Sequence, residues 1–171
     1  MNIVLCGMMG SGKTTTGIRI SELTGMRWYD TDDLITQKYG KISDIFEFYG
    51  EARFRELETE VVRSVAGEEN CVISTGGGCV LKPENSVAFK ESGGKIVFLK
   101  ASIETLFARA GHTGDERPLL KNTTFGHMKS LLDARTPVYV GCADVTVETD
   151  GKSVDEVARE VISACGVQVR A

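Results

Sequence analysis

The sequence lacks several features that mark whole classes of protein. No apolar run approaches the roughly 18–20 residues of a membrane-spanning helix. The five cysteines are odd in number, scattered and free of any CxxC pair, which argues against a disulfide framework or zinc site and favours reduced thiols. The net charge of −4 argues against bulk binding to nucleic acid or anionic membranes, which needs a basic face. Any anionic ligand must therefore be held by local positive charge.

The length and composition of the chain indicate an ordinary globular domain. The chain has 171 residues, of which 42% are hydrophobic and 26% charged, so we expect one domain over residues 1–171. There is no internal repeat or linker. The first residues, MNIVLCGMMG, lack a basic n-region, and their apolar run stops at a glycine-rich motif. We therefore expect a strand there rather than a signal peptide, and a cytoplasmic protein, or an organellar one after processing.

Short apolar runs alternate with helix-like segments. Buried strands are expected at 3–6, 71–74 and 96–99, and shorter ones at 28–29 and 145–147. Helices are expected at 13–25, 31–39, 43–49, 51–66, 84–90, 102–110, 123–135 and 153–164. This alternation predicts an α/β fold with a parallel sheet flanked by helices. Ligands in such folds bind beyond the carboxyl ends of the strands.

Residues 7–14, GMMGSGKT, match the phosphate-binding pattern G-x-x-x-x-G-K-[ST] between a buried strand and a helix. Backbone N–H groups of such a loop surround phosphate oxygens, and the helix N-terminus adds positive charge. We expect Lys13 to reach the β- and γ-phosphates and the Thr14 hydroxyl to hold Mg²⁺. The candidate nucleotide-binding residues of this loop are Gly10, Ser11, Gly12, Lys13, Thr14 and Thr15. The motif alone does not identify the phosphate acceptor.

An acidic cluster, YDTDD, occupies residues 29–33. Asp30 ends a strand at the edge that carries the phosphate loop, so it could ligate Mg²⁺ directly or through water. Asp32 could accept hydrogen bonds from sugar-like hydroxyls. The alternative is structural: Thr31 or Asp32 could cap the next helix, with Asp33 in its first turn. We favour ligand roles for Asp30 and Asp32 and the helix start for Asp33.

A glycine triplet, Gly76-Gly77-Gly78, directly follows a buried strand and suggests a backbone that a ligand approaches closely. Arg55 lies on the 51–66 helix, where ion pairs with Glu58 or Glu51 are the structural alternative to a ligand role.

Two further arginines are candidates. Arg117 lies in the polar loop 111–121 and is either a surface residue or part of a basic lid over a triphosphate. Arg135 comes near the expected end of the helix 123–135, where it could instead complement the helix dipole.

Six segments together resemble the shikimate kinase family over residues 2–164. They are GMMGSGKTT at 7–15, DTD at 30–32, GEARFRELE at 50–58, STGGG at 74–78, RPLL at 117–120 and RTPVY at 135–139. The resemblance implies a P-loop fold with five parallel strands in the order 2-3-1-4-5, and phosphorylation of the 3-hydroxyl of shikimate by MgATP. It also implies a monomer with a substrate-binding region at about 31–60 and a mobile lid at about 111–122.

The resemblance also implies roles for individual residues. Lys13, Asp30 and Arg117 would be catalytic, with Thr14 and Asp30 near the metal. Nucleotide would contact the phosphate loop, Arg109 and Arg117. Shikimate would contact Asp32, Arg55, Gly76, Gly77, Gly78 and Arg135, with the two arginines on its carboxylate and Asp32 on its hydroxyls.

Two other functions stay open at this point. One is a kinase for another small polyol acid such as gluconate, and the other is a non-catalytic nucleotide-binding switch. One departure from the family pattern concerns the nucleotide: Arg109 is followed by Ala110 where the family often has a basic pair.

Overall fold

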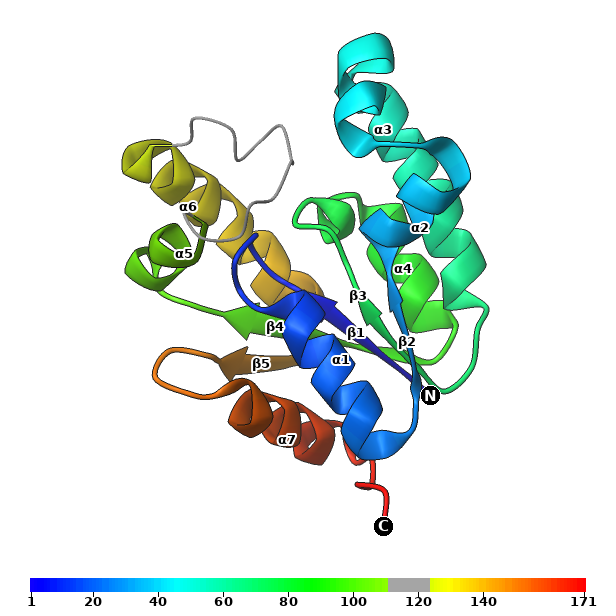
Figure 1. Ribbon diagram of the computed structural model, residues 1–171, viewed down its shortest axis with the longest axis vertical. Helices are drawn as coiled ribbons and strands as arrows, with labels where there is room; N and C mark the ends of the chain where they lie inside the picture. The colour runs from blue at the N-terminus through cyan, green and yellow to red at the C-terminus, as the bar shows by residue number, and fades with distance from the viewer. Residues whose placement is uncertain (111–123) are drawn as a thin grey trace.

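The computed structural model describes residues 1–110 and 124–171, which form one parallel sheet between two layers of helices (Figure 1). The strands are β1 (Asn2–Cys6), β2 (Arg27–Asp30), β3 (Cys71–Ser74), β4 (Gly94–Lys100) and β5 (Val145–Glu148). They pair in the order β2-β3-β1-β4-β5, and every pairing is parallel. The predicted sheet and its strand order are thus confirmed.

The helices also follow the predicted alternation with the strands. They are α1 (Lys13–Thr24), α2 (Thr31–Tyr39), α3 (Ile42–Ala66), α4 (Pro83–Glu91), α5 (Ile103–Ala110), α6 (Phe125–Cys142) and α7 (Val154–Cys165), with a short 3-10 helix at Cys79–Leu81. Side chains of α1 and α7 pack on one face of the sheet, and those of α3, α4, α5 and α6 pack on the other. Figure 1 shows α1 and α7 side by side in the first of these layers.

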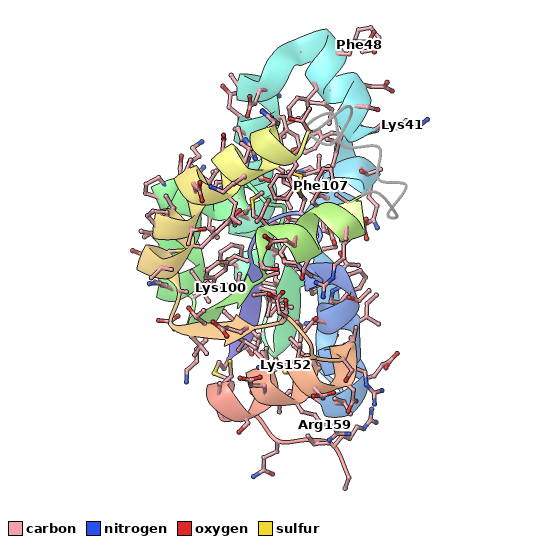
Figure 2. The ribbon with its side chains drawn as sticks, turned by 90° about the vertical axis from the view of Figure 1, so that its left-hand side faces the viewer. Lys41, Phe48, Lys100, Phe107, Lys152 and Arg159 are labelled. Atoms are coloured by element: carbon pink, nitrogen blue, oxygen red, sulfur yellow. The ribbon has the colours of Figure 1, made fainter. Side chains whose placement is uncertain are left out.

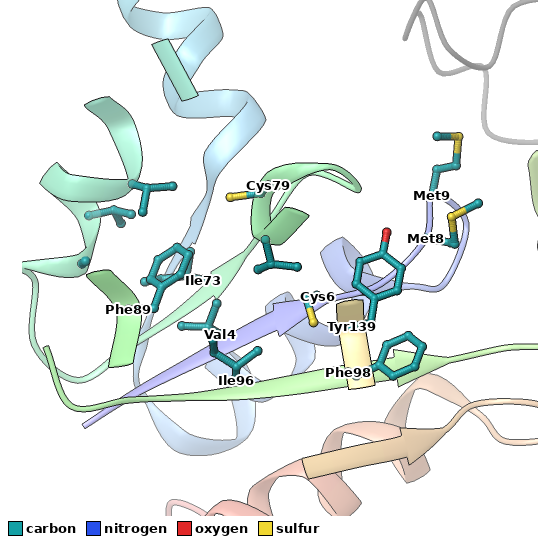
Figure 3. Close-up of a cluster of buried hydrophobic side chains, with 14 of the residues drawn as sticks. Val4, Cys6, Met8, Met9, Ile73, Cys79, Phe89, Ile96, Phe98 and Tyr139 are labelled. Carbon is teal, nitrogen blue, oxygen red and sulfur yellow. The ribbon is translucent and has the colours of Figure 1, made fainter. Parts of the chain in front are cut away.

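The central strand β1 shows why the sheet needs both layers. All five of its residues are buried. Ile3 and Leu5 point into the core beside α1 and α7, whereas Val4 and Cys6 point into the opposite core (Figure 3). Because side chains of a strand alternate between faces, a continuous apolar run is stable only where both faces are covered.

Helices α2 and α3 form a lobe with a small core of its own. That core contains Ile35, Ile45, Phe54, Leu57 and Val61. Helix α3 is broken at Gly50, whose φ of 83° and ψ of 170° are not helical. The predicted division into helices at 43–49 and 51–66 is therefore confirmed. The first half of α3 projects beyond the sheet, with Phe48 at its outer end (Figure 2).

The predicted end of helix 123–135 is wrong, because α6 runs on to Cys142 with Pro137 inside it. Proline removes one backbone N–H from a helix and usually ends or kinks it. Here the helix continues because Tyr139, fully buried, anchors the following turn in the core. Arg135 consequently lies in the helix interior and not at a terminus.

All five cysteines are free, four of them buried and Cys142 half-buried. In the part of the chain that the structure describes, no helix has the length and apolar character needed to cross a membrane.

Gly17 lies where α1 packs against the sheet with no room for a side chain, which supports a stability prediction. A methyl group there would lie 2.4 Å from Ser74 Oγ and 2.6 Å from Trp28 Nε1. We expect Gly17→Ala to lower the free energy of unfolding by about 1–3 kcal/mol because the core is overpacked. The matched control is Gly141→Ala in α6, since no described atom outside its own surroundings lies within 4 Å of the added methyl. Urea unfolding should show the control unchanged or stabilised; equal midpoints for both variants would contradict the prediction.

Candidate active site

The phosphate loop connects the carboxyl end of β1 to α1, as the motif predicts (Figure 1). Its tight path depends on glycine. Gly7, Gly10 and Gly12 all have positive φ, and a methyl group on Gly7 would lie 2.7 Å from the carbonyl oxygen of Leu99. Gly12 is the N-cap of α1, so the positive end of that helix faces the loop. The loop therefore has the backbone geometry of an anion cradle.

Two side chains within this loop have the chemistry to meet a phosphate. The ammonium group of Lys13 is buried and donates to the carbonyl oxygens of Gly7 (2.6 Å) and Met8 (3.0 Å). Ser11 Oγ is buried without a hydrogen-bond partner among the residues that the structure describes. A buried hydroxyl in this state is destabilising unless a ligand satisfies it. An incoming phosphate oxygen would supply the acceptor that Ser11 lacks.

Asp30 connects the phosphate loop to the start of α2. One carboxylate oxygen accepts from the backbone N–H groups of Asp32 (2.9 Å) and Asp33 (3.2 Å), and the other accepts from Thr14 Oγ (3.1 Å). Asp30 is thus the N-cap of α2, and the structural alternative, in which Thr31 or Asp32 caps this helix, is wrong. The reason is local geometry: Asp30 has the extended backbone of an N-cap, whereas Thr31 is already helical. Asp33 lies in the first turn, as expected.

The glycine triplet after β3 is where charged groups from three helices meet. A methyl group on Gly76 would lie 2.8 Å from Asp32 Oδ1, one on Gly77 would lie 3.3 Å from an Arg135 amino group, and one on Gly78 would lie 2.5 Å from an Arg55 amino group. Each glycine therefore leaves space for one charged side chain. The three side chains come from α2, α6 and α3. Together they place one carboxylate and two guanidinium groups along a single loop.

The structure shows the ion pairs that were the structural alternative for Arg55, whereas its ligand role stays a prediction. Its guanidinium forms ion pairs with Glu58 (2.9 Å) and Glu51 (3.4 Å) while it packs against Gly78. Arg135 is buried, and one of its amino groups lies 3.9 Å from the sulfur of Met8 in the phosphate loop. The two arginines thus reach the triplet from two different helices, α3 and α6.

Sequence reasoning missed the role of Glu58. Its side chain is only 1% exposed, one oxygen pairs with Arg55, and the other has no hydrogen-bond partner among the described residues. A methyl group on Gly76 would lie 3.3 Å from this second oxygen, so Glu58 sits beside Asp32 at the triplet. Burial, opposed by Arg55 and reinforced by the Asp32 charge, raises the pKa of Glu58 to about 6. Its position four residues after Phe54, beside the apolar stripe of α3, could have indicated this burial.

Two hydroxyl groups hold the triplet in place and were also missed. Tyr139 donates to the carbonyl oxygen of Gly77 (2.5 Å), and Thr31 Oγ accepts from the N–H of Gly76 (3.0 Å). Burial raises the pKa of the Tyr139 phenol, which therefore keeps the proton that it donates. Figure 3 shows Tyr139 in the core with its hydroxyl directed toward the end of the cluster where Met8 and Met9 lie. The spacing of Tyr139 four residues after Arg135 places both on one side of α6.

The remaining predicted residues are partly accounted for. Arg109 donates to the carbonyl oxygen of Gly10 (3.1 Å), so it lies against the phosphate loop, and Thr15 Oγ donates to the carbonyl oxygen of Gly12 (3.2 Å). Arg117 and the predicted lid at about 111–122 lie outside the described residues.

The oxygen donors at the loop suit Mg²⁺ only in combination with a nucleotide. The Thr14 hydroxyl and the Asp30 carboxylate are the kind of hard donors that Mg²⁺ prefers. Among the described residues, no group of three or more His, Cys, Asp or Glu side chains could hold a metal ion. Two protein oxygens completed by phosphate oxygens and water are the usual arrangement for Mg²⁺ at a phosphate-transfer site.

The buried Glu58 predicts a pH dependence of stability. Its folded pKa of about 6 lies above the value of 4.5 for a free carboxyl, so the folded state binds more protons between these two values. The contribution of Glu58 to stability is therefore full below pH 4.5 and is lost as pH rises through 6. Relative to Glu58→Gln, which carries no charge at either pH, the wild type should lose about 1 kcal/mol between pH 5 and pH 7. Urea unfolding of both proteins at both pH values measures this, and a constant difference would contradict it.

Comparisons with known proteins agree with this geometry. The family model described as shikimate kinase matches residues 9–166. A shikimate kinase of Geobacter sulfurreducens is 46% identical over 94% of this chain and 88% of its own length, and one of Caldicellulosiruptor bescii is 44% identical over 95% and 94%. A solved structure of the Acinetobacter baumannii shikimate kinase in complex with shikimate has a TM-score of 0.90 and 34% identity, covering 96% of this chain and 92% of that one. The chain belongs to the shikimate kinase family.

Proposed function

We propose that this protein is a shikimate kinase, which transfers the γ-phosphoryl group of ATP to the 3-hydroxyl of shikimate. The observation that carries the proposal is the glycine triplet, where Asp32, Arg55 and Arg135 meet next to the phosphate loop. A nucleotide-binding loop is common to many kinases, whereas this second set of groups matches one particular acceptor. Shikimate is a small ring with one carboxylate and three hydroxyls, so it needs both cationic and anionic partners.

Recognition of shikimate would divide between these groups. Guanidinium groups have fork-shaped donors that fit a carboxylate, so Arg55 and Arg135 would hold that end of the substrate. Asp32 would accept hydrogen bonds from ring hydroxyls. The missing side chains of Gly76, Gly77 and Gly78 would let the ring approach the backbone. Residues 31–60, which contain the lobe of α2 and the first part of α3, would form most of this substrate-binding region.

The phosphate side of the reaction depends on positioning and charge neutralisation more than on covalent chemistry. Gly10, Ser11, Gly12, Thr14 and Thr15 would surround the phosphates. Lys13 would exchange its bonds to the loop carbonyls for bonds to the phosphate oxygens, and so bring positive charge to the group being transferred. Arg109 would contact the nucleotide beside this loop. Arg117 remains a predicted catalytic residue on the resemblance alone.

Mg²⁺ is the expected cofactor, held by Thr14 and, directly or through water, by Asp30. When bound, it would neutralise charge on the phosphates. One oxygen of Asp30 accepts a hydrogen bond at the start of α2, and the other accepts one from Thr14. These two bonds fix the position of the carboxylate at the turn between β2 and α2.

We further propose that the protein works as a monomer in the cytoplasm. All groups assigned to substrate and nucleotide come from one chain, so the site does not require a partner subunit. Five free cysteines suit a reducing compartment.

The proposed activity has a direct test. Purified protein with MgATP should form ADP when shikimate is added and should form little without it, because the acceptor hydroxyl is missing. Gluconate, which is also a polyol acid, serves as the control acceptor. ADP formation with gluconate and none with shikimate would favour the alternative kinase and contradict the proposal.

The acidic cluster gives a second prediction, that its aspartates have separate roles. Asp32→Asn should raise KM for shikimate by about tenfold or more with a smaller change in kcat, because a charge-assisted hydrogen bond to substrate is weakened. Asp30→Asn should mainly lower kcat or change the Mg²⁺ dependence. Asparagine is also a good N-cap, so this variant separates the charge from the capping role.

Asp33→Asn is the matched control, since Asp33 lies in the same helical turn and is exposed. Its kinetic constants should stay close to those of the wild type, with a loss of only a few tenths of a kcal/mol in stability. Equal changes in both kinetic parameters for Asp30→Asn and Asp32→Asn would contradict the division of roles.

A further inference from the structure

A chain of two hydrogen bonds, the first part-buried and the second buried, connects the only tryptophan of the sequence to the phosphate loop. The indole N–H of Trp28 donates to Ser74 Oγ (3.0 Å), and the Ser74 hydroxyl donates to the backbone carbonyl oxygen of Lys13 (2.7 Å). Lys13 is the first residue of α1 and the lysine of the phosphate motif. The chain therefore ends on the backbone of the residue whose side chain is proposed to bind the phosphates.

The sheet brings these groups together. Ser74 is the last residue of β3 and is in register with Leu5 on one side and Asp30 on the other, so it lies in the middle of the edge that carries the site. Gly17 lies opposite, where any side chain would collide with both Ser74 and Trp28. The glycine thus lets α1 come close enough to the sheet for the hydrogen bonds to form.

Strand β2 holds the first turn of α1 at two points. Trp28 and Asp30 are two residues apart, so their side chains lie on the same face of the strand. Asp30 accepts a hydrogen bond from the Thr14 side chain, while Trp28 acts through Ser74 on the Lys13 backbone. Side chains of β2 thus position both Lys13, expected to bind phosphate, and Thr14, expected to bind the metal.

We propose that Trp28 and Ser74 are positioning residues, which fix the backbone of Lys13 and so the placement of its ammonium group during phosphoryl transfer. The inference rests on the proposed function. A displacement of about 1 Å in a positioned group can lower a rate by two orders of magnitude. Hydrogen bonds in a chain also polarise and strengthen one another, so removal of either member should weaken the other.

Kinetics of three variants test this. Ser74→Ala removes the central hydroxyl, and Trp28→Phe keeps an aromatic ring without the N–H. We expect kcat to fall about tenfold for Ser74→Ala and about threefold to tenfold for Trp28→Phe. KM for shikimate should change less than about twofold, because neither side chain lies among the groups assigned to that substrate. In the double variant, Trp28→Phe should add no more than about a further twofold to the loss from Ser74→Ala.

Tyr29→Phe is the matched control, because Tyr29 is the neighbouring aromatic residue of β2 and points to the opposite face. Its kcat should stay within about twofold of the wild type. The free energy of unfolding of each variant is also measured, so that a loss of kcat caused by misplacement of Lys13 can be told from one caused by loss of stability. Unchanged kcat in Trp28→Phe and Ser74→Ala, or fully multiplicative losses in the double variant, would overturn the proposal.

The wild-type protein gives a test that does not depend on the folding of any variant. Its single tryptophan gives one isolated indole N–H signal in an NMR spectrum. If the hydrogen-bond chain is coupled to the phosphate loop, binding of MgADP should slow solvent exchange of this proton at least about threefold. An exchange rate that MgADP does not change would overturn the proposal. This measurement needs no turnover. A failure of the positioning proposal can therefore be distinguished from a failure of the proposed shikimate-dependent activity.

Discussion

The absence of side chains at Gly76, Gly77 and Gly78 is the constraint on which the rest of the site depends. Side chains at these three positions would collide with the charged groups of α2, α3 and α6 that meet at this loop. With no Cβ atoms in the way, an aspartate and two arginines lie along one short segment beside the phosphate loop. Three helices thus bring one carboxylate and two guanidinium groups to a single loop, which is the arrangement that the proposed acceptor site requires.

The acidic cluster at 29–33 illustrates how one short segment serves several purposes. Asp30 uses one oxygen to start α2 and the other to contact Thr14, Asp32 reaches the glycine triplet, and Asp33 lies in the first helical turn. Repulsion among these carboxylates is offset by backbone N–H groups at the helix start and by nearby arginines. The same interactions that offset this repulsion therefore serve both the start of α2 and the proposed site.

Much of the fold could be predicted from local sequence signals. The contacts between segments far apart in the sequence could not. The buried run of β1, the phosphate motif and the break at Gly50 are determined by neighbouring residues. The extension of α6 past Pro137 depends on Tyr139 reaching the core, and the burial of Glu58 depends on how α3 lies over the glycine triplet. Such contacts join residues far apart in the sequence. A local pattern can therefore indicate which side of a helix is buried, as at Glu58, but not which groups that side meets.

The central claim is that two arginines and one aspartate meet at the glycine triplet to hold the acceptor. A crystal structure with MgADP and shikimate tests it most directly. The account predicts the shikimate carboxylate between Arg55 and Arg135 and ring hydroxyls on Asp32, with Asp30 on the metal side. A carboxylate bound away from both arginines, or hydroxyls held by Asp30 instead of Asp32, would contradict it.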